Sequence, residues 1–163
     1  MGLELYRIDD RLIHGQVVVG WGQPLDLRFI VLVDEEVATS DWEQELYRMG
    51  VPPEMEVYFE SVEEAARRLA EHQRDARPGL LLTGDIATMA RLVAATRAIP
   101  TVNLGGIHHK TGRIQRLRYV FLSPAEETAL RDLAHGGVAV TAQDVPAARP
   151  LPLDEVLAGE GNR

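Results

Sequence analysis

The chain has 163 residues, of which 45% are hydrophobic and 26% are charged, and these values are typical of one soluble globular domain. Its net charge of −8 and its pI of about 5.1 argue against a general affinity for nucleic acid or for an anionic membrane surface. The absence of cysteine excludes disulfides, thiolate catalysis and cysteine-ligated metal sites. The sequence shows neither a secretory signal at its start nor an apolar run of the ~20 residues that span a bilayer, so we expect a cytoplasmic protein.

Short apolar runs alternate with helical apolar stripes along the first part of the chain. Ser40 and Ser61 are each followed three residues later by a glutamate, the pattern of a capping box at a helix start. The run at 28–34 is apolar throughout, as expected for a strand covered on both faces. In chain order the patterns predict a strand at 3–8, a helix at 12–21, a strand at 28–34, a helix after Ser40, a strand at 55–59, a helix after Ser61, a strand at 79–83, a helix after Asp85 and a strand at 100–104.

Both tryptophans lie on predicted helical stripes. Trp21 shares a face with Val17, and Trp42 shares a face with Leu46 and Met49. We therefore expect both indole rings to pack in the core.

The alternation changes after residue 104. The segment 106–118 is basic and polar with a turn at Thr111-Gly112, which favours an irregular hairpin. A strand at 119–122, a helix that begins at Ser123-Pro124 and a strand at 138–142 follow. We expect the chain to end in an edge segment, a short helix from Asp154 and a loosely ordered tail over 155–163.

This alternation of strands and helices predicts an α/β fold with a mainly parallel central sheet, helices on both faces in three layers (α/β/α), and a single domain over residues 1–163. Ligands of such folds bind outside the carboxyl ends of the strands. The polar and glycine residues predicted at this edge are Asp9, Asp10, Arg11, His14, Asp34, Thr83, Gly84, Asp85, Asn103, Gly105 and Gly106.

His14 is the candidate nucleophile at this edge. Taken alone, a histidine here is better interpreted as a partly exposed surface residue, but Arg11 supplies donors suited to phosphate and Gly15 leaves backbone open to a ligand. A helix that starts here would add free N–H groups, and Asp9 or Asp10 could orient the imidazole. We predict that His14 accepts a phosphoryl group with no metal and no cofactor. The residues predicted to bind phosphate are Arg11, Asp10, Gly15, Gln16, Thr83 and Gly84.

The other histidines suggest no second reactive site. His108 and His109 lack a third ligand at metal-binding spacing, so we place them in a loop near the phosphate or a partner. His72 and His135 are expected to be solvated. The basic cluster Lys110, Arg113, Arg116 and Arg118 has two open interpretations: a solvated hairpin, or a docking face for an acidic partner.

The stretch RIDDRLIHGQVVVGW resembles the signature of the IIB subunit of the mannose/fructose/sorbose family of the bacterial phosphoenolpyruvate-dependent sugar phosphotransferase system. The resemblance continues, in matching order, through VDEEV (33–37), NLGG (103–106) and a basic GR (112–113), and it covers residues 4 to about 153. The chain departs from the family pattern at Thr83-Gly84-Asp85 and at His108-His109.

The resemblance implies a cytoplasmic IIB domain with a mostly parallel, seven-stranded sheet. It implies that His14 accepts a phosphoryl group from a IIA phosphohistidine and passes it to a sugar bound by membrane IIC and IID subunits, which would hold the domain at the inner face of the membrane. It places Arg11 and first-loop amides around the phosphate. The sugar and a homo-oligomeric state are left open.

Two other functions are considered beside this one. The first is a regulatory phosphoprotein of the same fold, whose His14 phosphorylation is read by a partner without sugar transport. The second is a nucleotide-binding α/β domain, against which the lack of a G-x-G-x-x-G or P-loop pattern counts.

Overall fold

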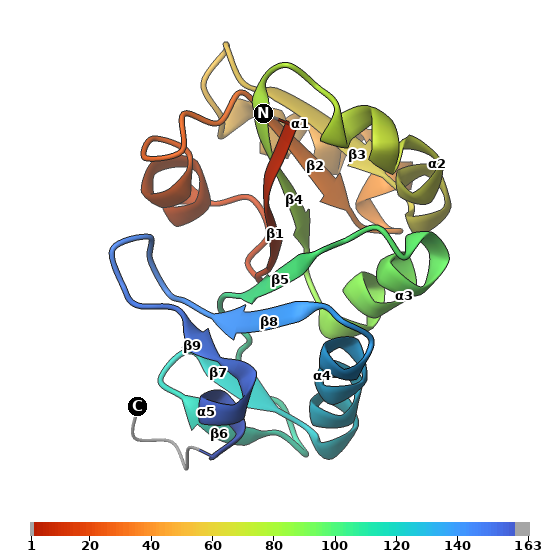
Figure 1. The fold of residues 1–163 in the computed structure, drawn as a ribbon. Helices are drawn as coiled ribbons and strands as arrows, with labels where there is room; N and C mark the ends of the chain where they lie inside the picture. Colours follow the sequence, from red (N-terminus) through yellow and green to blue (C-terminus); the bar gives the residue numbers. More distant parts are fainter. Residues whose placement is uncertain (1, 159–163) are drawn as a thin grey trace.

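The computed structural model describes residues 2–158 and, for Gln16, the backbone only. Its central feature is a seven-stranded sheet in the order β3-β2-β4-β1-β5-β8-β9, with β1 in the middle (Figure 1). All neighbouring strands are parallel except β8 and β9, which are antiparallel. The strands are β1 (Gly2–Ile8), β2 (Phe29–Val33), β3 (Glu56–Glu60), β4 (Pro78–Thr83), β5 (Thr101–Leu104), β8 (Ala139–Ala142) and β9 (Leu151–Pro152).

Helices flank both faces of this sheet, as the alternation predicts. α2, α3 and α4 lie along one face, and η1 lies on the other (Figure 1). An antiparallel hairpin of β6 and β7 and the last helix lie beside α4. The remaining elements are η1 (Gln16–Trp21), η2 (Val37–Thr39), α1 (Asp41–Met49), α2 (Val62–Gln73), α3 (Ile86–Thr96), β6 (Ile114–Leu117), β7 (Val120–Leu122), α4 (Pro124–His135) and α5 (Leu153–Ala158).

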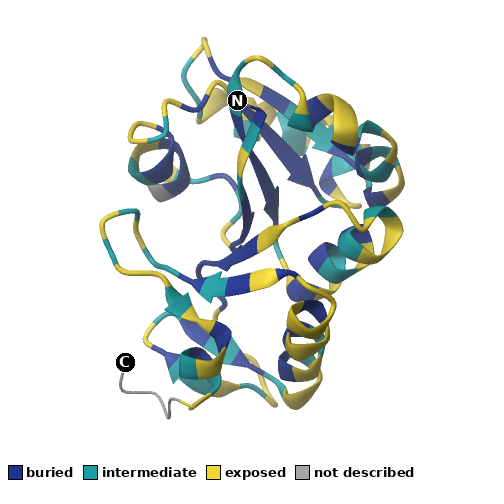
Figure 2. Ribbon diagram, viewed as in Figure 1, coloured by how far each residue is buried: buried dark blue, intermediate teal, exposed yellow. Residues whose placement is uncertain are grey.

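The strands are buried on both faces because apolar residues alternate between two cores. In β2, Phe29 and Val31 point to the core beneath α2 and α3, whereas Ile30 and Leu32 point to the core beneath η1. All five residues of β2 are buried (Figure 2). Such continuous burial needs helices on both sides of the sheet, which the flanking layers supply.

Local caps fix several helix starts where the sequence places them. The Ser40 and Ser61 hydroxyls accept hydrogen bonds from the backbone three residues on, at 3.4 Å and 3.1 Å. Ser123 and Glu126 form a reciprocal capping box with Pro124 at the first helical position. These contacts satisfy N–H groups that a helix leaves without an internal partner.

The predicted helix at 12–21 needs correction. Leu12 has a left-handed φ of 58°, and the regular helix begins only at Gln16, as a six-residue π-helix. A left-handed residue breaks right-handed helical geometry, so the residues before Gln16 form a loop. His14 therefore lies in a loop that precedes a short helix.

The core position predicted for Trp42 is wrong. Trp21 is buried at 5% exposure, but Trp42, Leu46 and Met49 are 71%, 56% and 76% exposed. The inward side of α1 is instead formed by Gln44, whose amide donates to carbonyls of η2, and by Tyr47, whose ring lies against Phe59.

His72 also departs from its predicted position. It is 1% exposed, its Nε2 lies 2.9 Å from Oε2 of the buried Glu60, and Arg68 donates to the same oxygen. This ion-paired group allows a histidine to lie inside the helical layer. At the other end, α5 gives helical structure to residues up to Ala158 within the predicted loose tail, and 159–163 lie outside the described residues.

Candidate functional site

The loop after β1 is held at the carboxyl edge of the sheet by both neighbouring strands. Asp9 N–H donates to the carbonyl of Thr83 at the end of β4, and Asp10 N–H donates to the carbonyl of Gly106 just past β5, each at 2.9 Å. The loop then turns sharply at Leu12, whose side chain lies over Gly84 so closely that a Cβ there would be 2.8 Å from Cδ2. A left-handed non-glycine residue is strained, and such strain is characteristic of functional loops.

Asp9 is the centre of the site. Its carboxylate is fully buried and accepts three hydrogen bonds from Arg11: from the backbone N–H at 3.1 Å, from Nε at 3.1 Å and from Nη2 at 3.0 Å. Nη2 of Arg7 lies 3.6 Å from the same group. Burial alone would raise the pKa of Asp9, but hydrogen bonding from His14 and Arg11 outweighs burial and holds this pKa far below its ordinary value. Asp9 is therefore a fixed negative charge.

His14 lies against this carboxylate. Its Nε2 is 3.6 Å from Oδ1 of Asp9, and its side chain keeps 20% exposure. An ionised carboxylate only accepts hydrogen bonds, so the tautomer with its hydrogen on Nε2 is the one that suits this neighbour. In that tautomer the lone pair is on Nδ1, and an imidazole oriented in this way can act as a nucleophile.

Arg7 supports the site from below, and sequence reasoning missed it. It is 1% exposed, and its guanidinium donates to the Asn103 side chain and to the carbonyls of Gln143 and Asp144 while it lies 4.6 Å from the centre of the Trp21 ring. Burial lowers the pKa of Arg7, and the charge of Asp9 opposes that change. An arginine between the buried Tyr6 and Ile8 of this strand is the signal that could have identified it, because a buried charge needs partners.

The two glycines of NLGG make room for these charges. A Cβ on Gly105 would lie 2.7 Å from Oδ2 of Asp9 and would also overlap the Arg7 guanidinium. A Cβ on Gly106 would lie 3.4 Å from Nε of Arg11. Gly105 is required by close approach rather than by backbone angle.

Asp10 serves a second loop. Its carboxylate accepts hydrogen bonds from the backbone N–H of His108 at 2.7 Å and from its ring Nδ1 at 2.6 Å, and Arg113 donates to the His108 carbonyl. Of the two aspartates that the sequence offers as partners of His14, Asp9 is the one in contact. Asp10 instead fastens the 105–113 loop beside the site.

The other residues predicted to bind phosphate lie in different surroundings. Gly15 is exposed, with no atom within 4 Å of an added Cβ. Thr83 is fully buried, and its hydroxyl donates to the Asp85 carbonyl at 3.2 Å. Gly84 lies beneath Leu12, and the side chain of Gln16 is outside the described residues. Thr83 and Gly84 thus support the loop from the β4 side.

The basic hairpin is largely neutralised within the chain. Arg113 pairs with Glu126 at 2.7 Å, Arg116 with Glu127 at 2.6 Å and Arg118 with Asp144 at 2.9 Å. These pairs leave little positive charge for an acidic partner, which favours the interpretation as a structural hairpin.

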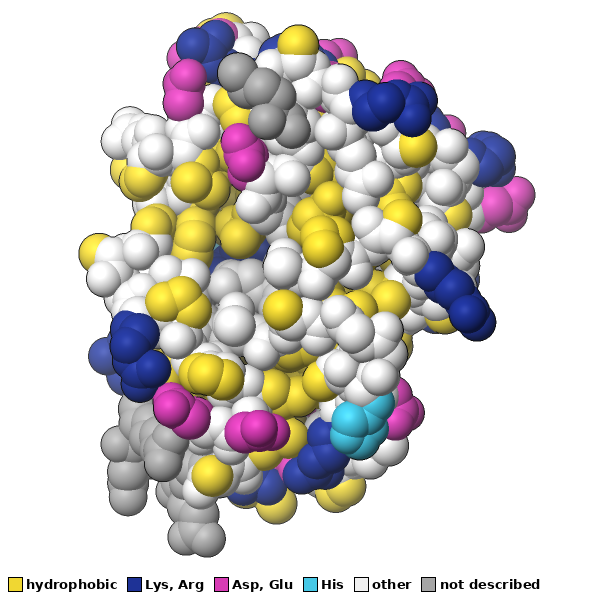
Figure 3. Space-filling view, viewed as in Figure 1, with side chains coloured by type: hydrophobic (Ala, Val, Ile, Leu, Met, Phe, Trp, Pro, Cys, Tyr) yellow, Lys and Arg dark blue, Asp and Glu magenta, His cyan; other side chains and the backbone are white. Residues whose placement is uncertain are grey.

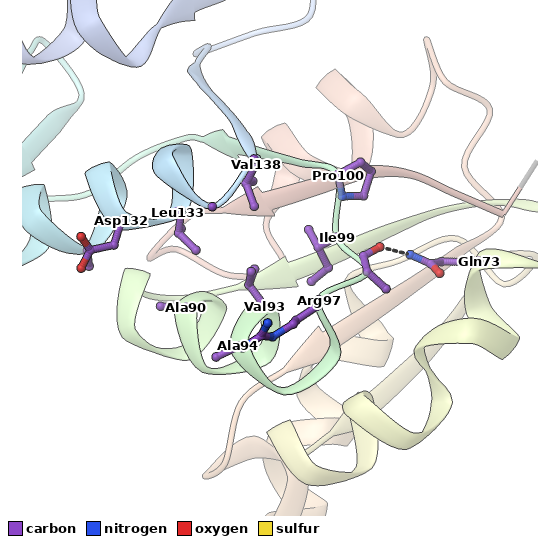
Figure 4. Close-up of a pocket in the computed structure, with 14 residues that line it drawn as sticks. Gln73, Ala90, Val93, Ala94, Arg97, Ile99, Pro100, Asp132, Leu133 and Val138 are labelled. Carbon is purple, nitrogen blue, oxygen red and sulfur yellow. Dashed lines mark hydrogen bonds between the residues drawn. The ribbon is translucent and has the colours of Figure 1, made fainter.

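A hollow of about 870 Å³ lies between α3 and α4, at the amino ends of β5 and β8 (Figure 4). Apolar side chains of alanine, valine, leucine, isoleucine and proline form most of its walls, and Gln73 donates to the Ala98 carbonyl at one side. His14 and its partners belong to the opposite, carboxyl edge of the sheet. The reactive groups and this hollow are therefore separate features.

Two further findings concern residues 2–158. No group of three or more His, Cys, Asp or Glu side chains there has a metal-binding arrangement. Within the same residues, no helix has the length and apolar character needed to cross a membrane.

Comparisons with known proteins agree on one family. The family model described as PTS system sorbose subfamily IIB component matches residues 3–163. The chain is 34% identical, over 85% of its length and 84% of the relative's, to the PTS system sorbose-specific EIIB component of Klebsiella pneumoniae. It is 33% identical, over 87% of its length and 90% of the relative's, to the N-acetylgalactosamine-specific phosphotransferase enzyme IIB component 1 of Escherichia coli.

A solved structure gives the same result for the fold. The crystal structure of the IIBSor domain of the sorbose permease from Klebsiella pneumoniae is similar with a TM-score of 0.86 and 29% identity. The match covers 97% of this chain and 98% of that domain.

Proposed function

The chain belongs to the sorbose subfamily of IIB components of the sugar phosphotransferase system, and from this premise we propose that its phosphocarrier residue is His14. IIB components of this kind are phosphotransferases that serve sugar uptake. The relatives are named as sugar-specific components, which gives no support to the alternative of a regulatory phosphoprotein.

One observation carries the proposal: Nε2 of His14 faces the buried carboxylate of Asp9 at 3.6 Å. In the proposed reaction, the lone pair on Nδ1 attacks the phosphorus of a IIA phosphohistidine. The new P–N bond to His14 forms as the P–N bond to the donor histidine breaks. No proton has to move, because Nε2 keeps its hydrogen toward Asp9 throughout.

The surrounding charges suit the arrival of an anion. Asp9 contributes one negative charge, and Arg7 and Arg11 contribute two positive charges close to it. These two guanidinium groups favour the incoming phosphoryl group and its transition state. Arg11, at 35% exposure, is the cation nearer to solvent, whereas Arg7 is buried beneath Asp9. We propose that Arg11 binds the phosphoryl oxygens together with backbone N–H groups near Gly15 and Gln16, while Asp10, Thr83 and Gly84 keep the loop in place.

The second half of the cycle returns the site to its first state. A hydroxyl of the sugar attacks the phosphorus of phosphorylated His14, the P–N bond breaks and a P–O bond forms. The hydroxyl proton leaves to a base outside this chain or to water. We propose that the sugar is held by membrane IIC and IID subunits, with residues 1–163 acting as one cytoplasmic domain at the inner face of the membrane.

Phosphorylation in a reconstituted system tests the proposal. Phosphoenolpyruvate, enzyme I, the small histidine carrier protein and a IIA donor should give an acid-labile phosphoryl group on the wild-type chain and none on His14→Ala. His135→Ala is the matched control, because His135 is an exposed histidine at the end of α4, and it should label normally. Nuclear magnetic resonance of the labelled ring should assign the phosphoryl group to Nδ1. Label that persists in His14→Ala, or that resides on Nε2, would contradict the proposed site.

A further inference from the structure

α1 presents its apolar side to solvent. Trp42, Leu46 and Met49 recur at helical spacing on one face, and they are 71%, 56% and 76% exposed. No residue of α1 is buried. A contiguous exposed apolar stripe of this kind is characteristic of a surface that binds another molecule.

The stripe runs between acidic side chains. Helical geometry places Asp41 and Glu45 on one side of it and Glu43 on the other. Arg48 is the one basic residue of this helix, and its Nη1 lies 4.0 Å from Glu45. The exposed face of α1 is therefore apolar along its centre and negative along its borders.

This helix belongs to the segment that holds the chain's charge imbalance. Residues 34–60 contain nine aspartate or glutamate residues and one arginine, so they alone account for the net charge of −8. Three of these acidic residues pair with arginines outside the segment: Glu35 with Arg91, Glu56 with Arg77 and Glu60 with Arg68. Elsewhere charges of both signs are mixed, as the basic and acidic side chains around the rim of the face in Figure 3 illustrate.

The stripe ends beside a hollow. After Met49 the chain turns through Val51, Pro52 and Pro53, which with Arg48 line a depression of about 360 Å³ at the amino end of β3. The stripe thus combines an apolar helix face with a depression at one end. A short helix or loop can bind to a surface of this shape.

We propose that α1 is the docking surface for a basic, amphipathic cytoplasmic segment of the membrane subunits, an inference that rests on the proposed function. Charge complementarity selects this occupant. A second copy of the chain would present the same acidic borders and be repelled, and so would an anionic bilayer. Cytoplasmic loops of membrane proteins are enriched in lysine and arginine, and they can carry apolar side chains between these residues. Such a segment matches both the stripe and its borders.

The position of α1 suits this role. α1 follows β2 and η2, so its first residues lie near the carboxyl edge of the sheet, the edge that carries the His14 loop. Its inner side chain Tyr47 and the η1 residues Val17 and Val18 contribute to the same hydrophobic core. A membrane subunit bound along α1 would therefore be on the face of the sheet that η1 covers, next to the edge that carries the His14 loop.

Binding to reconstituted membrane subunits tests the inference. The purified chain is mixed with IIC/IID subunits in vesicles of neutral phosphatidylcholine, with protein-free vesicles of the same lipid as the reference, and the bound fraction is measured by flotation. The triple variant Trp42→Gln, Leu46→Gln, Met49→Gln should bind about tenfold more weakly or worse. The matched control is Ile114→Gln, since Ile114 is 55% exposed on β6 away from the acidic segment, and it should bind like the wild type.

The acidic borders are tested separately. Binding by Asp41→Asn, Glu43→Gln, Glu45→Gln should be weaker by a few-fold and should depend less on salt than binding by the wild type. The fluorescence of Trp42 measures binding directly. Its emission should shift to shorter wavelength on binding, whereas the emission of the buried Trp21 should not change.

Each outcome bears on the proposal in one direction. Wild-type binding by the apolar triple variant overturns it, as does an equal loss in Ile114→Gln. Binding to protein-free vesicles, or self-association through α1 in sedimentation, assigns the surface to lipid or to a second copy and also overturns it. His14→Ala should bind the subunits normally, and the apolar triple variant should still be phosphorylated by IIA. A failure of the docking surface is thus distinguishable from a failure of His14 as the phosphocarrier.

Discussion

The loop after β1 and the helix α1 both break the usual rule for side-chain placement, in opposite directions. At the loop, the charges of Asp9 and of Arg7, near the end of β1, are inside the protein. In α1, Trp42 and Met49 are outside it. The buried charges have their partners within the chain, whereas the exposed apolar stripe has none among the described residues. The first arrangement therefore organises chemistry, and the second provides a surface for another molecule.

Removal of the central charge of the loop should have the largest effect on stability. Asp9→Asn leaves Arg7 buried without its carboxylate, and losing one member of a buried ion pair costs about 3–5 kcal/mol of unfolding free energy. Asp10→Asn should lower the free energy of unfolding by about 1 kcal/mol or less, because the Asp10 side chain is 26% exposed. Urea denaturation of both variants measures the difference, and equal losses would contradict a central role for Asp9.

The wild type and Asp9→Asn should also differ in how their stability depends on acid pH. The pKa of Asp9 is lower in the folded chain than its ordinary value of 3.8, so Asp9 stabilises the fold above that pH. This contribution is lost as the pH falls below about 4 toward the folded pKa. The wild type should therefore lose stability more steeply than Asp9→Asn over this range. Parallel curves would mean that the carboxylate is not held ionised by its neighbours.

Glycine substitutions in and beside the loop should cause smaller losses of stability. Gly105→Ala pushes a methyl group against Asp9 and Arg7, and overpacking of this kind costs about 1–3 kcal/mol. Gly15→Ala, which meets open space, should leave stability nearly unchanged. Thermal denaturation compares the two. A stable Gly105→Ala chain would show that the charge cluster can move aside.

The smallest effect is expected on α1. Replacement of Trp42, Leu46 and Met49 by glutamine removes no buried contact, so the free energy of unfolding should change by less than about 0.5 kcal/mol per site. The same urea titration checks this value. A large loss would mean that the stripe stabilises the fold of the isolated chain, and the contrast with the loop would no longer hold.

The comparison also explains which features the sequence predicts. The parallel sheet and the caps at Ser40 and Ser61 depend on local patterns and are confirmed. The prediction that polar residues gather at one edge of the sheet is confirmed, because parallel strands bring their carboxyl ends together. Periodicity shows that Trp42, Leu46 and Met49 share a face, but it cannot show which way that face points, and this is why the core prediction for Trp42 is wrong.

The interior of the site is harder to predict for a different reason. Arg7 is held by Asn103 and by carbonyls at 143 and 144, which are far away in sequence and meet it only in the folded sheet. The choice between Asp9 and Asp10 as the partner of His14 depends on the turn at Leu12, and a left-handed leucine has no clear sequence signal. The roles of Thr83 and Gly84 in phosphate binding stay predictions.

The two edge strands of the central sheet, β3 and β9, have a consequence for how the protein behaves in a crowded cell. β9 is only two residues long and includes Pro152, which has no N–H to offer, and β3 begins and ends with a glutamate. Short, proline-containing or charged border strands resist the strand-to-strand stacking by which sheet proteins aggregate. A carrier that binds successive partners has to remain monodisperse at high concentration. These edge strands allow the molecules to collide repeatedly without forming fibrils.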